Sequence, residues 1–114
     1  MAAYIIAHVD VENWEAYREY MRHTPRVIRQ FGGRFIARGG DMVTLEGPTE
    51  TLRVVLIEFP SMEQATAFYN SADYARTKKL REGGGSARFV AIDGYSNELW
   101  QAAVEESNSL ELPV

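Results

Sequence analysis

The chain has 114 residues, of which 46% are hydrophobic and 25% charged, as expected for one globular domain. It has no cysteine, which excludes disulfides, thiolate metal sites and a cysteine nucleophile, and no apolar run approaches the ~20 residues of a membrane span. The net charge of −4 arises entirely in residues 96–114, because residues 1–95 carry equal numbers of acidic and basic side chains. Such a charge distribution disfavours nucleic acid and anionic membranes as partners, so we expect a soluble cytoplasmic protein.

The first part of the chain predicts a strand followed by a helix. Residues 4–10 form a short apolar run of β-favouring side chains. Asn13 is placed to cap a helix whose apolar residues recur at spacings of three and four. Pro25 interrupts this pattern, so we expect a kinked or broken helix in which Thr24 caps the second piece. Gly32-Gly33 supplies the stop signal.

The middle of the chain predicts strands joined by a hairpin. Residues 34–38 return to strand character, and we expect a bulge at 39–40 before a further extended segment at 42–45. Residues 46–51 indicate a hairpin loop, because they contain a Gly-Pro pair among polar residues. Residues 52–59 form the most apolar strand of the chain.

The last part predicts two helical pieces, a strand and a terminal helix. Ser61 and Gln64 fit a capping box, in which each side chain bonds the other residue's backbone N–H. Ser71 is placed to cap the second piece. A final strand is expected over 87–93, and residues 96–106 have helical character.

This βαββαβ order predicts an α+β, ferredoxin-like domain, with a four-stranded antiparallel sheet and helices on one face. The other sheet face then lacks a cover, although both faces of the 52–59 strand carry apolar side chains. A homodimer that packs two such faces together would bury them.

A set of short stretches carries a resemblance to a known family. The stretches are residues 4–10, 17–20, 32–40, 45–47, 55–61 and 69–71 with Tyr74. Together they resemble a small bacterial family of unknown function in the dimeric α/β-barrel superfamily, over roughly residues 4–95. The resemblance implies the fold and the homodimer but transfers no reaction. Antibiotic-biosynthesis monooxygenases and muconolactone isomerases, which are cousins in that superfamily, act on small organic molecules without a metal.

Three ionisable residues on predicted strands are candidate catalytic groups. His8 titrates near neutral pH and can move a proton, although a structural histidine that holds Asp10 or a backbone carbonyl is the alternative. Arg38 and Glu58 are expected to lie roughly opposite each other across the hairpin. Such a pair can serve as a tuned base or an anion clamp, or it can be a structural ion pair at the dimer seam.

A second group of candidates lies where the two helical pieces meet. Tyr69, Asn70 and Tyr74 can present hydrogen-bond donors to a small ligand. The same residues can equally pack one helix against the next, and Ser71 is expected to be a cap.

Two function classes follow. One is a cofactor-independent enzyme that acts on a small, largely apolar organic molecule by proton transfer or by isomerase-like or monooxygenase-like chemistry. In such an enzyme Glu58 or His8 would move a proton and Arg38 would hold an oxyanion. The other is a non-catalytic ligand-binding or dimeric interaction module. No metal site is expected, because His8 and His23 lie on different elements without acidic neighbours at ligand spacing.

The acidic segment 96–114 is expected to lie outside the domain formed by residues 1–95. It is either a mobile appendage or a helix that docks on the partner subunit through Leu99, Trp100 and Val104. We favour docking, because a free tail rarely carries an exposed indole.

Overall fold

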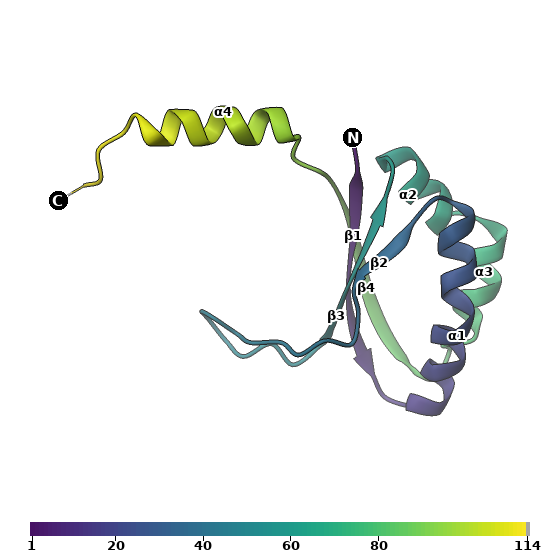
Figure 1. The fold of residues 1–114 in the computed structure, drawn as a ribbon. Helices are drawn as coiled ribbons and strands as arrows, with labels where there is room; N and C mark the ends of the chain where they lie inside the picture. The colour runs from purple at the N-terminus through teal and green to yellow at the C-terminus, as the bar shows by residue number, and fades with distance from the viewer. Residues whose placement is uncertain (114) are drawn as a thin grey trace.

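Four antiparallel strands form one sheet in the order β2-β3-β1-β4, in a computed structural model that describes residues 1–113. In chain order the elements are β1 (Ala3–Val11), α1 (Trp14–Gln30), β2 (Arg34–Ala37), β3 (Arg53–Phe59), α2 (Met62–Tyr69), α3 (Ala72–Lys79), β4 (Gly85–Asp93) and α4 (Asn97–Asn108). The predicted ferredoxin-like α+β fold is confirmed, with α1, α2 and α3 on one face of the sheet (Figure 1).

Alternation along the central strands decides which side chains form the core. In β1, Ile5, Ala7 and Val9 are buried against the helices, while the residues between them face the other side of the sheet and are partly exposed. This second side, here called the open face, has no helix packed on it (Figure 1).

Aromatic rings fill the space between the sheet and the helices. The ring of Phe68 on α2 lies 5.2 Å from that of Phe59 on β3 and 4.6 Å from that of Tyr74 on α3. The chain enters β2 close against Phe59, because a Cβ atom built on Gly33 would lie 2.5 Å from the Phe59 ring. Glycine at position 33 therefore permits the backbone to pass over this ring.

The predicted break in the first helix is wrong. Helix α1 runs continuously through Pro25, which has no N–H to donate to the carbonyl of Met21 four residues earlier. The hydroxyl of Thr24 donates to that carbonyl at 3.3 Å instead. Thr24 thus compensates the missing bond inside one helix and does not cap a second one.

The predicted caps of the later helices are confirmed in part. Ser61, Ser71 and Ser96 each accept a hydrogen bond from a backbone N–H in the first turn of α2, α3 and α4. The reciprocal half of the capping box does not form, because the side-chain amide of Gln64 donates to the carbonyl of Phe31 at 3.2 Å. Gln64 therefore ties α2 to the end of α1.

The connection between β2 and β3 is longer than predicted. The β2–β3 ladder ends at Ala37, with a register shift between Phe35 and Ala37, and residues 38–52 form no strand. The extended segment expected at 42–45 therefore has no ladder, since the facing segment contains Gly47-Pro48 and cannot pair regularly. We call residues 38–52 the hairpin arm, and it projects away from the helices on the side of the open face (Figure 1).

The molecule is extended for its size. Its accessible surface is 8279 Å², against roughly 6,300 Å² for a compact monomer of this mass. Its radius of gyration is 17.4 Å, where about 13 Å is usual. The excess comes from the hairpin arm and from α4, which both project on the open-face side (Figure 1). Within residues 1–113, no helix is both long enough and apolar enough to cross a membrane.

Candidate functional site

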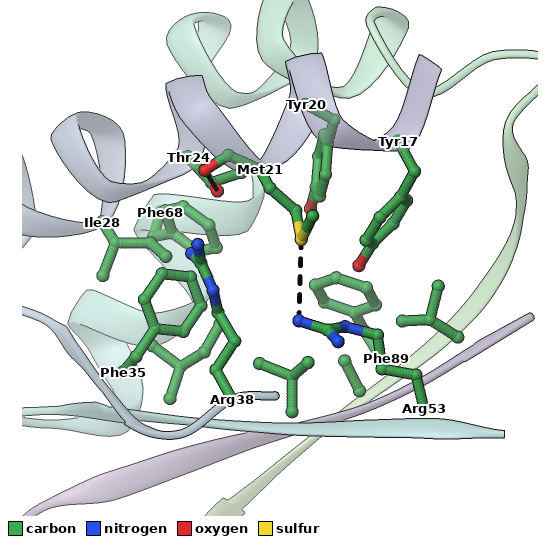
Figure 2. Close-up of a pocket in the computed structure, with 14 residues that line it drawn as sticks. Tyr17, Tyr20, Met21, Thr24, Ile28, Phe35, Arg38, Arg53, Phe68 and Phe89 are labelled. Atoms are coloured by element: carbon green, nitrogen blue, oxygen red, sulfur yellow. Dashed lines mark hydrogen bonds between the residues drawn. The ribbon is translucent and has the colours of Figure 1, made fainter. Parts of the chain in front are cut away.

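A small cavity lies between α1 and the helix-facing side of the sheet. Figure 2 shows its lining, in which Tyr17, Tyr20 and Met21 descend from α1 toward side chains that rise from the strands. The enclosed free space is about 20 Å³, room for about one water molecule. Most of the lining is aromatic or aliphatic, so the cavity is an apolar site with few polar groups.

Two arginines bring positive charge to this cavity. Arg38 follows β2 and lays its guanidinium 4.4 Å from the centre of the Phe35 ring. Arg53 begins β3, and its Nη2 donates to the sulfur of Met21 at 3.6 Å (Figure 2). Both guanidinium groups point from the sheet toward α1, and both side chains line the same cavity (Figure 2).

The guanidinium group of Arg53 lacks a strong acceptor. Among residues 1–113 its Nε is buried without a hydrogen-bond partner, and its Nη2 donates to the thioether of Met21, a weak acceptor, with the phenol of Tyr17 close by. The residues lining the cavity include no carboxylate and no histidine. A buried donor left unpaired costs about 1–3 kcal/mol, so a bound anion would gain the bond that the protein does not supply.

Tyr17 lies at the same end of the cavity, beside Arg53. Burial raises the pKa of its phenol, and the nearby Arg53, which lowers that pKa, offsets only part of the effect. Tyr17 is therefore protonated at neutral pH and offers a hydroxyl to an oxyanion rather than a base to a proton.

A pair of phenols lies behind the cavity. The hydroxyls of Tyr20 and Tyr74 share a buried hydrogen bond of 2.7 Å, and burial is the main reason that the pKa of Tyr20 lies far above its usual value. The guanidinium of Arg81 lies 5.3 Å from the centre of the Tyr20 ring, and its Nε is buried without a partner. This part of the core thus holds two buried phenols beside a partly buried cation.

The structure separates Arg38 from Glu58, so their predicted pairing is wrong. Glu58 lies on the open face, where its Oε1 accepts from Nε of Arg34 at 3.2 Å. The register shift after Phe35 places Ala37 opposite Leu56 on the open face and therefore turns Arg38 to the helix side. A one-residue shift reverses the faces of all following side chains, which is why simple alternation failed here.

His8 also lies on the open face, away from the cavity. Its Nε2 is 3.7 Å from a carboxylate oxygen of Glu50 in the hairpin arm, and its Nδ1 is buried without a partner. The strand register places Val54 beside His8, whereas Glu58 lies beside Tyr4 at the other end of β1. His8, Arg38 and Glu58 therefore do not form one site. Within residues 1–113, no group of three or more acidic or histidine side chains is placed to hold a metal ion.

The second group of candidates is divided as well. Tyr69 accepts from Nζ of Lys78 at 3.0 Å, and Asn70 is the exposed C-terminal cap of α2. These two residues line a hollow of about 270 Å³ between α2 and β4. Tyr74 is buried and lies behind the cavity lining, where its hydroxyl bonds that of Tyr20 and its ring packs against Phe68.

Arg53 and Tyr17 were not among the site residues predicted from the sequence. Tyr17 belonged to a helical stripe that is usually core, and no pattern distinguished it. Arg53 carried a usable signal, because it alternates with Val55 and Ile57, so a charged residue was directed to the buried face of the most apolar strand.

Known structures share this fold. The RPA0582 protein of unknown function from Rhodopseudomonas palustris has a TM-score of 0.68 at 20% identity, and 83% of each chain is covered. A dimeric ferredoxin-like protein of unknown function from Jannaschia sp. CCS1 has a TM-score of 0.61 at 11% identity, covering 82% of this chain and 100% of that one. A protein provisionally assigned as an antibiotic biosynthesis monooxygenase, from Nitrosomonas europaea, has a TM-score of 0.53 at 13% identity, covering 84% and 92%. At these identities the likeness shows the fold alone.

No curated protein matches the chain. The family model of a domain of unknown function (DUF1330) matches residues 2–95, which include the whole sheet and α1 to α3 but not α4. The resemblance found in the sequence is thereby confirmed: the chain belongs to the DUF1330 family.

Proposed function

We propose that the cavity between α1 and the sheet binds a small, largely apolar organic anion, such as a single-ring carboxylate, enolate or phenolate. The observation that carries this proposal is the buried, unpaired Nε of Arg53 in an otherwise apolar lining. Arg53 and Arg38 would hold the anionic oxygen, and the Tyr17 hydroxyl would donate to it.

Such a site supports a cofactor-independent reaction through oxyanion stabilisation. Two guanidinium groups favour the anion of a bound enol or phenol, so they lower its pKa and increase its share of the electron-rich form. Solvent would take up the proton that the bound enol releases, and return of a proton from solvent to another atom of the same anion would complete an isomerisation. Monooxygenase-like chemistry would begin from a bound phenolate and would need dioxygen as a second substrate: one oxygen atom becomes a quinone carbonyl and the other leaves as water. The proposal assigns no role to His8 or Glu58, which lie on the open face.

Access for a ligand requires side chains to move. The free space of about 20 Å³ is smaller than one aromatic ring. Met21, Arg38 and Arg53 are long, unbranched side chains at this cavity, and only a thioether contact joins Met21 to Arg53. An anion that replaces the thioether contact forms a stronger hydrogen bond with Arg53. This bond compensates for the free-energy cost of moving the side chains to open the cavity.

The test compares a charged ligand with a neutral ligand of the same shape. Isothermal titration calorimetry of the full chain with benzoate should give binding, and benzamide should bind at least tenfold more weakly. Arg53→Gln should raise the dissociation constant of benzoate by about tenfold or more, because a charge-assisted hydrogen bond contributes about 1.5–3 kcal/mol. Arg29→Gln, an exposed arginine at the end of α1, is the matched control.

Equal binding of benzoate to wild type and Arg53→Gln would contradict the proposed site. If neither compound, nor a larger ring such as naphthoate, binds to the wild type, the enzyme proposal fails. The chain is then better described as an interaction module.

We also propose that the chain forms a homodimer through the open face. Val90 and Ile92 on β4 are 40% and 53% exposed there, beside Tyr4 and Ile6 of β1. The accessible surface exceeds that of a compact monomer by roughly 2,000 Å², more than the ~800 Å² per partner of a standard interface. The related structure from Jannaschia sp. CCS1 is described as dimeric, which supports the same assembly.

A further inference from the structure

Helix α4 lies outside the residues that match the family, and within residues 1–113 no helix or strand packs extensively against it. None of its residues is buried, although Ser96 caps its first turn. A 12-residue helix is marginal in water without tertiary packing. We propose that α4 is an exchanged arm, which packs its apolar side against a second copy of this chain. The inference rests on the proposed homodimer and extends it.

One side of α4 is suited to such packing. Leu99, Trp100, Ala103 and Val104 recur at helical spacing and form an apolar stripe, while Glu98 and Glu105 lie on the opposite side. Leu99 and Trp100 are 54% and 56% exposed, which is unusual for an indole on a regular helix. The stripe has the composition of a buried helix face and lacks only a surface to cover it.

The position of α4 keeps the helix away from the body of its own domain. Gly94, whose N–H donates to the carbonyl of Ala2 at 2.7 Å, fixes the end of β4 against β1. From there α4 extends away from the helix layer on the open-face side (Figure 1). The hairpin arm, with exposed Met42, Val43 and Leu45, projects to the same side (Figure 1). The open face thus lies between two projecting segments, the hairpin arm and α4, and all three carry exposed apolar residues (Figure 1).

A second copy is the occupant that the surface and charge favour. Two open faces of the same shape can cover each other in a twofold dimer. The same twofold operation places the hairpin arm and α4 of each copy against the other copy. The segment 96–114 carries four glutamates and no basic residue, which disfavours an anionic lipid surface.

The experiment measures dimer dissociation and the environment of Trp100 in the full chain. Sedimentation equilibrium should show a dimer for the wild type, and a dissociation constant raised at least tenfold by Leu99→Glu or Val104→Glu. Gln101→Glu adds the same charge beside the stripe and should leave the dissociation constant within about threefold. In a Trp14→Phe background Trp100 is the only tryptophan, and its emission should shift to the red as dilution separates the copies.

Three results would overturn the inference. A dimer whose dissociation constant is unaffected by Leu99→Glu and Val104→Glu, with Trp100 emitting as an exposed indole at all concentrations, would leave the homodimer intact but remove α4 from it. A monomer at all concentrations would refute both. Trp100 emission that stays blue-shifted at dilutions where sedimentation shows separated monomers would show that α4 folds onto its own chain. None of these results bears on benzoate binding, so the cavity proposal stands or fails separately.

Discussion

The hydrogen bond between the hydroxyls of Tyr20 and Tyr74 lies in the core, and replacing one tyrosine by phenylalanine leaves the other hydroxyl without that partner. The two residues are 6% and 1% exposed, so water cannot freely replace the bond. Loss of a typical hydrogen bond costs about 1 kcal/mol, and a buried hydroxyl left unpaired costs about 1–3 kcal/mol. We therefore expect Tyr20→Phe and Tyr74→Phe each to lower the free energy of unfolding by about 1–2 kcal/mol.

The double variant should cost about as much as either single one, because it removes both hydroxyls and so leaves neither of them without its partner. Urea unfolding followed by circular dichroism, at one fixed protein concentration, measures all three variants. A loss of 1 kcal/mol lowers the melting temperature of a domain this size by roughly 4–8 °C. Tyr95→Phe is the control, because Tyr95 is 66% exposed. Additive losses in the double variant, with no coupling, would refute the reasoning.

Two further predictions follow from the same cluster and cavity. Burial raises the pKa of Tyr20 above its unfolded value of 10.0, so the folded state keeps a proton that the unfolded state loses; stability should be constant below about pH 10 and should fall above it. Above that pH, the free energy of unfolding should therefore fall less steeply with pH in Tyr20→Phe than in the wild type, by up to about 1.36 kcal/mol per pH unit. An unchanged slope would contradict this. Arg53→Met should raise the free energy of unfolding of the ligand-free protein by about 1 kcal/mol, because removing a buried unpaired donor outweighs the weak contact of Arg53 with the Trp14 ring. A thermal melt that shows destabilisation would indicate that Arg53 is structural.

Local signals were sufficient for most of the fold. The order of elements follows from hydrophobic periodicity, and the caps at Ser61 and Ser71 follow from side chains that satisfy orphan N–H groups. These interactions join residues only a few positions apart, so they can be predicted from the sequence alone. The continuous helix through Pro25 depends on one compensating hydroxyl at Thr24, which the same residues could have used as a cap.

The site was harder to predict, because it depends on a single irregularity in strand pairing. The shift between Phe35 and Ala37 moves Arg38 from the face of Glu58 to the cavity, and nothing in residues 34–40 specifies that shift without the partner strand β3. The role of Arg53 depends on what surrounds it in space. Its missing acceptor becomes visible only when Met21 and Tyr17 are placed beside it.

The central claim is that this cavity receives an organic anion at Arg53. The most direct measurement is a titration of the isotopically labelled full chain with benzoate, followed by two-dimensional NMR of the backbone amides and arginine Nε–H groups. If benzoate binds in this cavity, we expect saturable chemical-shift changes at Arg53 Nε–H and at the backbone amides of Tyr17 and Met21. The backbone amide signals of His8 and Glu58 should not change. Shifts confined to the open face, or none at Arg53, would contradict it.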